Sequence, residues 1–318
     1  MLHSPHEMLQ NHPIEIEGVY VQNNSCQGWG RFLRVAASSN SALDAMELRR
    51  RLLPFAAIFA IFASDAGAEA ITGARYAAPV ERYGHFALGR PHEYARLTAT
   101  TDAGRSLSFD LPEDEVFEDL EPRLVSFAAG EPKEVLAIVS QRDSGSRLVL
   151  IRLSGGRLEL SAESPAIGTP QRWLNPVGVA DLDGDGRAEI AAVITPHIGG
   201  TLKVYRRIGS KLVEIAALAG FSNHVYGSSD LGLSAPVLVG GRVRLLVPDV
   251  PRLRLRLIAL EGGGLVEVGR CAVPAPVTGA IRVVSTSAVS IGLASGQRMI
   301  ALNDCLANRG PGAVKVGP

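Results

Sequence analysis

The sequence predicts an all-β fold built from repeated four-stranded units. Three observations predict this fold class. Short β-prone runs are separated by Gly, Pro and Ser turns through most of residues 81–304. One pattern returns at a spacing of about 54 residues. No long segment with a 3.6-residue hydrophobic period interrupts the strands, which argues against helical, doubly wound and TIM-barrel folds.

The amino-acid composition restricts the classes of function that this chain can have. The chain has 318 residues, with 32 basic and 32 acidic side chains and therefore no formal net charge. This balance gives no support for nucleic-acid binding, which needs a basic face. Hydrophobic residues make up 46% and charged residues 20%, a balance typical of a globular protein.

Residues 46–68 have the layout of a secretory signal peptide. A basic stretch, Arg49–Arg51, precedes an apolar stretch, Leu52–Ala63, and Ala66-Gly67-Ala68 fits a small-residue cleavage site. Ala68-Glu69-Ala70 is a second choice of cleavage site, and a short buried helix is the alternative reading of the whole segment. We expect export to the periplasm or beyond, with no stable membrane span after cleavage.

The polar residues 1–45 precede this segment and show no sustained periodicity. We interpret them as a non-native upstream extension, with a disordered tail before an uncleaved anchor as the alternative. The folded part is then 69–318. It holds Cys271 and Cys305, an even number that suits an oxidising compartment and favours a disulfide over two buried thiols.

The repeat is clearest where a strand enters a Gly turn and leaves as another strand. Segments 147–160, 201–215 and 252–268 align, and the expected strands include Arg147–Leu153, Leu202–Tyr205, Val243–Val247 and Arg254–Leu260. The preceding segments 120–140, 174–195 and 235–250 also align, and 93–111 and 288–304 are fainter copies. Four-stranded units at this period predict a β-propeller of about five blades, with the closing blade shared between the two ends; a β-sandwich is the alternative.

One loop carries a metal-binding pattern. In the segment 181–189, carboxylates stand at positions 1, 3, 5 and 9, and Gly186 permits a sharp turn. Hard oxygen ligands at this spacing suit Ca²⁺, and the absence of His and Cys argues against zinc. The expected ligands are the carboxylates of Asp181, Asp183, Asp185 and Glu189 and the backbone carbonyl of Arg187.

This loop is not an EF-hand, because position 12 is Ala192 and both flanks, 177–180 and 190–194, look like strands. The loop is therefore expected on a β-hairpin. An acidic turn without an ion is the alternative. Four clustered carboxylates would repel one another at neutral pH without a counter-ion, so we favour calcium.

The segment VADLDGDGRAEIAAV resembles the FG-GAP/VCBS repeat of integrin-α-like propellers, whose hairpin loops carry D-x-D-x-D-G-x-x-[DE]. The resemblance implies a propeller in which calcium rigidifies blade hairpins, usually in extracytoplasmic binding proteins. Other units depart from the pattern: the loop at 126–134 lacks the aspartates, and the unit with Gly240-Gly241 has lost the loop. A single, structural calcium site is expected.

Other groups are weaker signals. Arg252, Arg254 and Arg256 alternate with leucines and could form an anion-binding face, although a solvated face is the simpler interpretation. His85 and His92, like Trp173, are expected to serve packing or surface roles.

Catalytic signatures such as G-x-S-x-G, a P-loop or H-E-x-x-H are absent from the sequence. We therefore expect a monomeric, non-enzymatic binding module for a protein or glycan partner. A polysaccharide hydrolase or lyase with channel carboxylates is the alternative, and a purely structural module is a third possibility.

Overall fold

The computed structural model describes residues 69–90 and 92–307, and this part of the chain is all-β. The predicted signal segment at 46–68 and the extension at 1–45 lie outside the described residues. Within the described part there are 19 strands and one short helix, α1 (Leu302–Ala307). That helix has neither the length nor the apolar character needed to cross a membrane.

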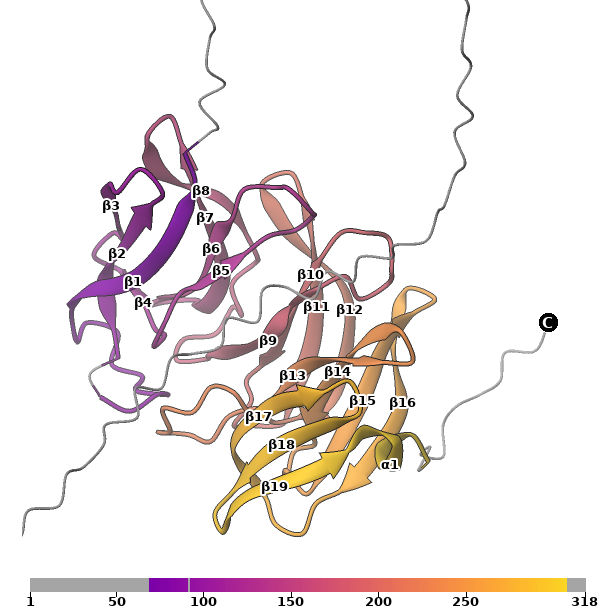
Figure 1. The fold of residues 1–318 in the computed structure, drawn as a ribbon. Helices are drawn as coiled ribbons and strands as arrows, with labels where there is room; N and C mark the ends of the chain where they lie inside the picture. Colours follow the sequence, from indigo (N-terminus) through magenta and orange to yellow (C-terminus); the bar gives the residue numbers. More distant parts are fainter. Residues whose placement is uncertain (1–68, 91, 308–318) are drawn as a thin grey trace, which may run out of the picture. The chain divides into compact units, whose positions relative to one another are not determined.

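The strands form three hydrogen-bonded sheets of twelve, four and three strands. The largest sheet consists of three antiparallel units joined by the single residue pairs Tyr94–Phe117 and Lys211–Glu163, so the chain runs through five consecutive units (Figure 1). The first holds β1 (Ile71–Pro79), β2 (Tyr94–Thr101) and β3 (Ser106–Asp110). In the second, β4 (Glu115–Phe117) and β5 (Arg123–Val125) both pair with β6 (Glu134–Gln141), followed by β7 (Gly145–Ser154) and β8 (Arg157–Glu163). The third holds β9 (Leu174–Ala180), β10 (Glu189–Ile194), β11 (Gly200–Ile208) and β12 (Lys211–Phe221).

The fourth unit holds β13 (Ala235–Val239), β14 (Arg242–Pro248), β15 (Arg254–Glu261) and β16 (Gly264–Ala272). The fifth holds β17 (Val277–Ser285), β18 (Ala288–Leu293) and β19 (Gly296–Ala301). The four strands expected at Arg147–Leu153, Leu202–Tyr205, Val243–Val247 and Arg254–Leu260 lie within β7, β11, β14 and β15, so those predictions are confirmed.

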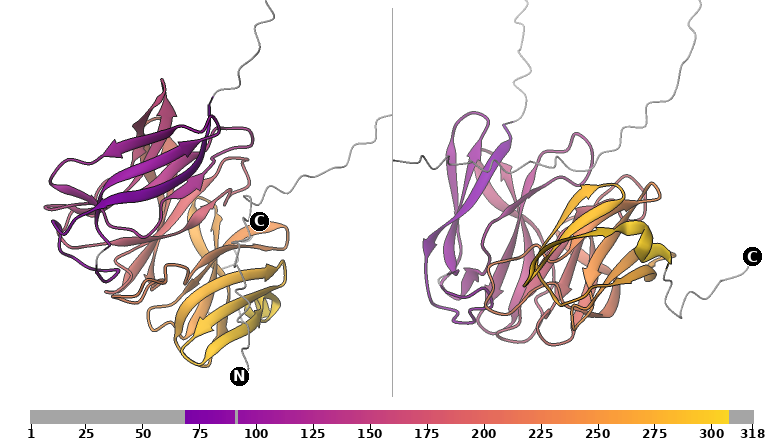
Figure 2. Two further views of the ribbon diagram at one scale, coloured as in Figure 1. Left: turned by 60° about the vertical axis from the view of Figure 1, so that its left-hand side comes forward. Right: turned by 60° about the horizontal axis from the view of Figure 1, so that its bottom comes forward.

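Hydrophobic residues fill the space between successive units, and each interior sheet has two apolar faces. In β6, Leu136 and Ile138 pack toward the third unit, whereas Val135, Ala137 and Val139 pack toward the first. Four such cores separate the five units, which follow one another in chain order in the left view of Figure 2. Burial on both faces explains why the interior strands read as continuous apolar runs rather than alternating ones.

The end units do not share a closing sheet, so that part of the prediction is wrong. Among the described strands, no backbone pairing joins β1–β3 to β17–β19. The face of the first unit that points away from the second is polar: Arg75 and Thr100 are exposed, and Arg96 forms an ion pair with Asp110 at 2.6 Å. Such a face is typical of a terminal repeat that meets solvent.

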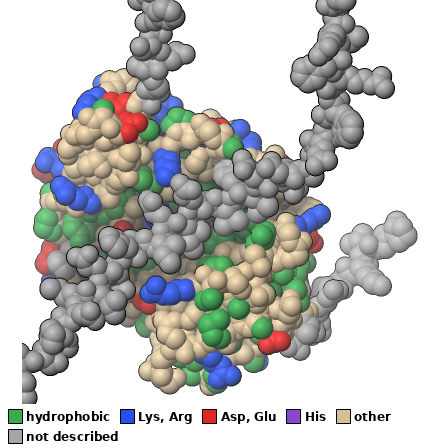
Figure 3. Space-filling view, viewed as in Figure 1, with side chains coloured by type: hydrophobic (Ala, Val, Ile, Leu, Met, Phe, Trp, Pro, Cys, Tyr) green, Lys and Arg blue, Asp and Glu red, His purple; other side chains and the backbone are tan. Residues whose placement is uncertain are grey.

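The last unit ends in α1 where the interior units have a fourth strand. This helix lies against β16 and is joined to it by a disulfide between Cys271 and Cys305, which confirms the predicted pair. The surface over β17–β19 carries exposed apolar side chains, including Val284 at 59% and Met299 at 55% exposure (Figure 3).

The segment between β1 and β2 contacts a distant part of the chain. The Tyr226 hydroxyl donates a hydrogen bond to the His85 carbonyl at 2.9 Å, across 141 positions of sequence. The Gly227 N–H donates to the Ala87 carbonyl, also at 2.9 Å. These bonds tie the first unit to the loop that follows the third.

Candidate metal centre

The acidic loop, residues 181–188, closes the hairpin between β9 and β10. Ala180 and Glu189 are the last cross-strand pair before the loop. Strands therefore flank the loop on both sides, as the sequence predicts, and the helices of an EF-hand are absent from its flanks. Each end of the loop is thus held by a β-strand.

Asp181 organises the turn by accepting hydrogen bonds from the backbone. Its Oδ1 accepts from the N–H groups of Gly184 at 2.7 Å and Asp185 at 3.1 Å, and its Oδ2 accepts from Gly186 at 2.9 Å. Gly184 and Gly186 have φ values of +86° and +87°, a region that favours glycine. The two glycines of the motif are therefore required by the path of the loop.

Three of the predicted ligands converge. Asp181, Asp183 and Glu189 each offer a carboxylate oxygen, and these oxygens lie within 4.8 Å of one another. Glu189 is the first residue of β10 and is fully buried, and this burial raises the pKa of its carboxyl. Its Oε2 accepts a hydrogen bond from the Leu182 N–H at 3.0 Å.

Of the two remaining predicted ligands, Asp185 lies outside this cluster of carboxylates, whereas the backbone carbonyl of Arg187 stays a prediction. Asp185 is exposed, and its Oδ1 accepts a hydrogen bond from the Arg187 N–H at 2.8 Å. The Arg187 side chain extends toward Glu131 of the neighbouring unit, at 3.7 Å. Asp185 would have to turn inward to reach an ion shared by the other three carboxylates.

Arg206, on β11, is the residue that the sequence analysis missed. Its Nη2 lies 2.5 Å from Asp183 Oδ2 and 2.7 Å from Glu189 Oε1. These hydrogen bonds raise the pKa of the guanidinium, which stays charged and partly neutralises the acidic cluster. The loop motif contains no signal for Arg206, because the contact arises only from the pairing of β10 with β11.

The donor set fits a hard cation. All three converging groups supply oxygen, two of them through aspartates in a short loop and one through a buried glutamate. Oxygen-only donors suit calcium or magnesium better than zinc or copper. The Arg206 guanidinium already forms ion pairs with Asp183 and Glu189. A bound cation would therefore compete with it for these two carboxylates.

The predicted arginine face is largely neutralised. Arg254 lies 3.3 Å from Asp249 and Arg256 lies 2.7 Å from Glu267. Arg252 is not in the strand: it has a φ of +57° in the preceding turn, and its Nη1 donates to the Ser222 hydroxyl at 3.2 Å. Arg254 is mostly exposed, whereas the Arg256 side chain is only 17% exposed, so these residues form neither an open anion site nor a uniformly solvated face.

A second cluster of polar groups surrounds His85. Its Nδ1 lies 2.8 Å from Oε1 of Glu118, a carboxylate with 1% exposure. Trp173 is buried and its Nε1 donates to the Glu118 carbonyl at 2.9 Å. Asp119 is likewise buried and paired with Arg123 at 2.6 Å. In residues 69–90 and 92–307, the acidic loop is the single place where three metal-ligating groups converge.

Comparisons with known proteins do not assign this chain to a family. The chain matches no protein-family model, and no curated protein matches its sequence.

Proposed function

We propose that this chain is an exported, calcium-stabilised β-propeller that acts as a non-enzymatic binding module for a protein or glycan partner. The five face-packed units would be its blades, and the resemblance of the acidic loop to FG-GAP/VCBS repeats supports this assignment. Export rests on the signal-like segment at 46–68. The Cys271–Cys305 disulfide is consistent with an oxidising compartment.

The observation that carries the proposal is the convergence of Asp181, Asp183 and Glu189 on one hairpin. Calcium bound there would link β9, β10 and the loop between them. Binding to the folded state alone stabilises a protein by an amount that grows with ion concentration. With a dissociation constant of about 0.1–1 mM, typical of extracellular modules, 10 mM calcium would add about 1.4–2.7 kcal/mol.

Among the described residues, no specific contact favours the hydrolase or lyase alternative. The buried carboxylates Glu118 and Asp119 are each engaged by a basic side chain, His85 and Arg123. A general acid or base would need a carboxyl group that can exchange a proton with a substrate. Assay of the purified chain on neutral and uronic polysaccharides checks this: release of new chain ends would contradict the proposal.

The calcium site is tested by thermal unfolding of the full chain in 10 mM calcium and in chelator. We expect the wild-type melting temperature to rise by about 3–10 °C in calcium. Asp181→Asn should abolish the rise. The control is Asp110→Asn, which removes an exposed carboxylate that is paired with Arg96 outside the loop. This variant should show the same calcium-induced rise in melting temperature as the wild type.

Arg206→Gln separates ion binding from simple charge pairing. Without Arg206 the three carboxylates lack their protein counter-ion, so the variant should melt lower in chelator and show a larger calcium-induced rise. Equal melting temperatures with and without calcium, in both the wild type and Arg206→Gln, would mean that the loop binds no calcium and that the calcium part of the proposal is wrong.

A further inference from the structure

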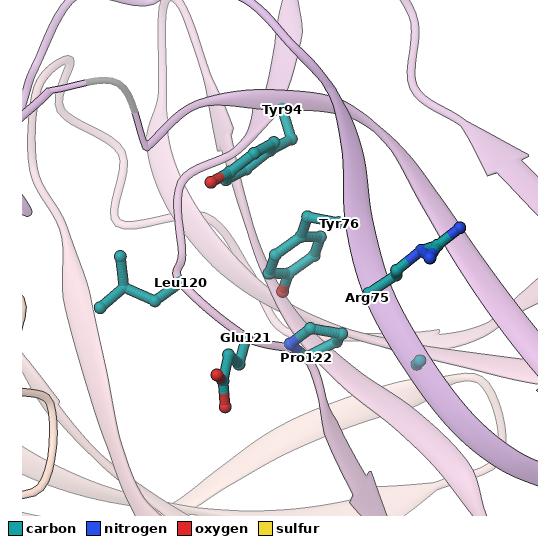
Figure 4. A pocket seen from close by; sticks show the side chains of 7 residues that line it. Arg75, Tyr76, Tyr94, Leu120, Glu121 and Pro122 are labelled. Carbon is teal, nitrogen blue, oxygen red and sulfur yellow. The ribbon is translucent and has the colours of Figure 1, made fainter. Parts of the chain in front are cut away.

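A pocket on the first two units lies away from the acidic loop. It has a volume of about 420 Å³ and is bordered by Tyr76 of β1, Tyr94 of β2 and the segment Leu120–Pro122 that links β4 to β5. The two tyrosines form one side, and Leu120 and Glu121 form the other (Figure 4). Its size is within the range of small-molecule sites.

The aromatic side of this pocket is held in place. The Tyr76 ring stacks on Tyr94 with centroids 5.6 Å apart and on the buried Phe117 at 5.0 Å. The Tyr76 hydroxyl donates to Asp119 Oδ2 at 3.1 Å, and Asp119 in turn is paired with Arg123 at 2.6 Å. The wall therefore needs little ordering when a ligand arrives, which lowers the entropic cost of binding.

Two polar groups of the pocket have no partner within the part of the chain that the structure describes. The half-buried Tyr94 hydroxyl makes no hydrogen bond there, and the exposed Glu121 carboxylate makes neither a hydrogen bond nor an ion pair. Arg75 also borders the pocket, but its side chain points away from the tyrosines (Figure 4). The pocket thus offers an aromatic surface, a hydroxyl and a carboxylate, with the Arg75 guanidinium at its border.

We propose that this pocket binds a neutral sugar ring of a glycan, which rests on the binding function proposed above and specifies its ligand class. A pyranose has an apolar C–H face, which can pack on Tyr94, and a rim of hydroxyls, which can donate to Glu121. Hydrogen bonds to a carboxylate are stronger than those between neutral groups. The Glu121 carboxylate repels the anionic groups of sulfated and uronic sugars.

A cationic ligand fits less well. Recognition of an ammonium group relies on the faces of several aromatic rings. Tyr76 already stacks with Tyr94 on one side and Phe117 on the other, so it has no open face to offer. One aromatic platform beside a hydrogen-bond acceptor suits a flat polyol better than a caged cation.

The test is binding of the purified full chain to an array of neutral di- to tetrasaccharides of glucose, galactose, mannose and N-acetylglucosamine. The best binder is then titrated calorimetrically. We expect a dissociation constant of about 1 mM or tighter. Glu121→Ala and Tyr94→Ala should each weaken binding at least about tenfold.

Two variants serve as controls. Arg75→Ala changes an exposed side chain of the same pocket that points away from the tyrosines, and it should alter affinity less than about twofold. Tyr94→Phe keeps the ring and removes the hydroxyl, and its loss should be smaller than that of Tyr94→Ala. Since Glu121 is exposed, its substitution tests the pocket even if Tyr94→Ala unfolds the protein.

No binding to any neutral oligosaccharide at 10 mM would overturn the proposal. So would sugar binding that survives both Glu121→Ala and Tyr94→Ala, although the glycan-binding function itself would then stand at another site. Preference for sulfated or uronic glycans would also contradict it. Calcium-dependent unfolding of the same samples reports separately on the calcium part of the proposed function.

Discussion

At the scale of single residues, Gly269 shows how closely the C-terminal helix approaches the sheet beneath it. A Cβ atom at this position in β16 would lie 2.5 Å from the Cys305 carbonyl oxygen and 3.1 Å from Leu306 Cα. Both are backbone atoms, so they cannot rotate away as a flexible side chain would. A side chain here must displace α1 itself.

We therefore expect Gly269→Ala to lower the free energy of unfolding by about 1–3 kcal/mol through overpacking. The matched control is Gly264→Ala in the same strand, where a Cβ would have no neighbour within 4 Å and should be nearly neutral. Chemical denaturation of both variants measures the difference. Equal stabilities would show that α1 can shift without cost.

The half-buried His197 and the fully buried His224 form a pair with depressed pKa values. The pKa of His197 is lowered to about 3 and that of His224 to about 4, in both cases mainly by loss of solvation; His224 also lowers the pKa of His197, and Arg252 contributes to both. His224 Nε2 donates to the Ser228 carbonyl at 2.9 Å, so its Nδ1 accepts from His197 Nε2–H at 2.7 Å. Of the other groups that face the pair, His85 lowers the pKa of His197, whereas Asp230 raises that of His224.

This pair predicts loss of stability in acid. The unfolded chain takes up protons near pH 6.5 and the folded chain does so only near pH 3–4, so stability is complete above about pH 6.5 and falls as the pH drops toward 4. With partial exposure of His197 taken into account, we expect a loss of roughly 2 kcal/mol between pH 6.5 and 4.5. His224→Gln should flatten the profile, measured by thermal melts, and an unchanged slope would contradict this cause.

At the scale of elements, the disulfide fixes the place of α1. It joins Cys271 of β16 to Cys305 of α1 and closes a loop with a sequence separation of 34. By the loop-entropy model, such a bond contributes about 3–4 kcal/mol. The bond therefore makes up for the small apolar surface that a six-residue helix can bury.

Reduction should accordingly lower the melting temperature of the wild type. The double variant Cys271→Ala/Cys305→Ala should melt lower than the oxidised wild type and show no response to reductant, which makes it the control. A wild type that melts at the same temperature with and without reductant would contradict a stabilising role.

The hairpin at the acidic loop shows which elements can be read from sequence. Alternating aspartates and two glycines specify a turn in which the Asp181 carboxylate accepts hydrogen bonds from the loop's own backbone N–H groups. The loop and its flanking strands could therefore be predicted. Arg206 could not, because its contact depends on the register of β10 against β11. The Tyr76–Tyr94 pocket is also invisible in sequence, since its two sides come from different units.

At the scale of the whole described chain, the sequence repeat predicted the interior units better than it predicted the first and last units. A sequence repeat reflects what the interior units have in common. Here that is a sheet four strands wide with two buried faces, in which β4 and β5 of the second unit share the first place. End units differ because one of their faces meets solvent, and the first unit places Arg96 and Asp110 there. A period in the sequence contains no information about such differences, so the expected shared closing sheet was wrong.

Packing on both faces predicts that neighbouring residues in one strand both stabilise the fold. Ile138 and Val139 belong to different cores, with 0% and 1% exposure. We expect Ile138→Ala to cost about 2–5 kcal/mol and Val139→Ala to cost somewhat less, by cavity formation. Thr100→Ala, on the exposed face of the first unit, is the control and should change stability by less than about 0.5 kcal/mol. A neutral Val139→Ala would contradict two-sided burial.

The bond between Tyr226 and His85 has a consequence for how the protein forms during synthesis. The first unit can pair its strands early, but its loop cannot make this contact until the third unit and the following residues have emerged, 141 positions later. Contacts between distant segments form slowly, because a long loop must first be closed. The nascent first unit would therefore wait with the His85 and Ala87 carbonyls unpaired, and docking of residues 226 and 227 would be a late step in maturation.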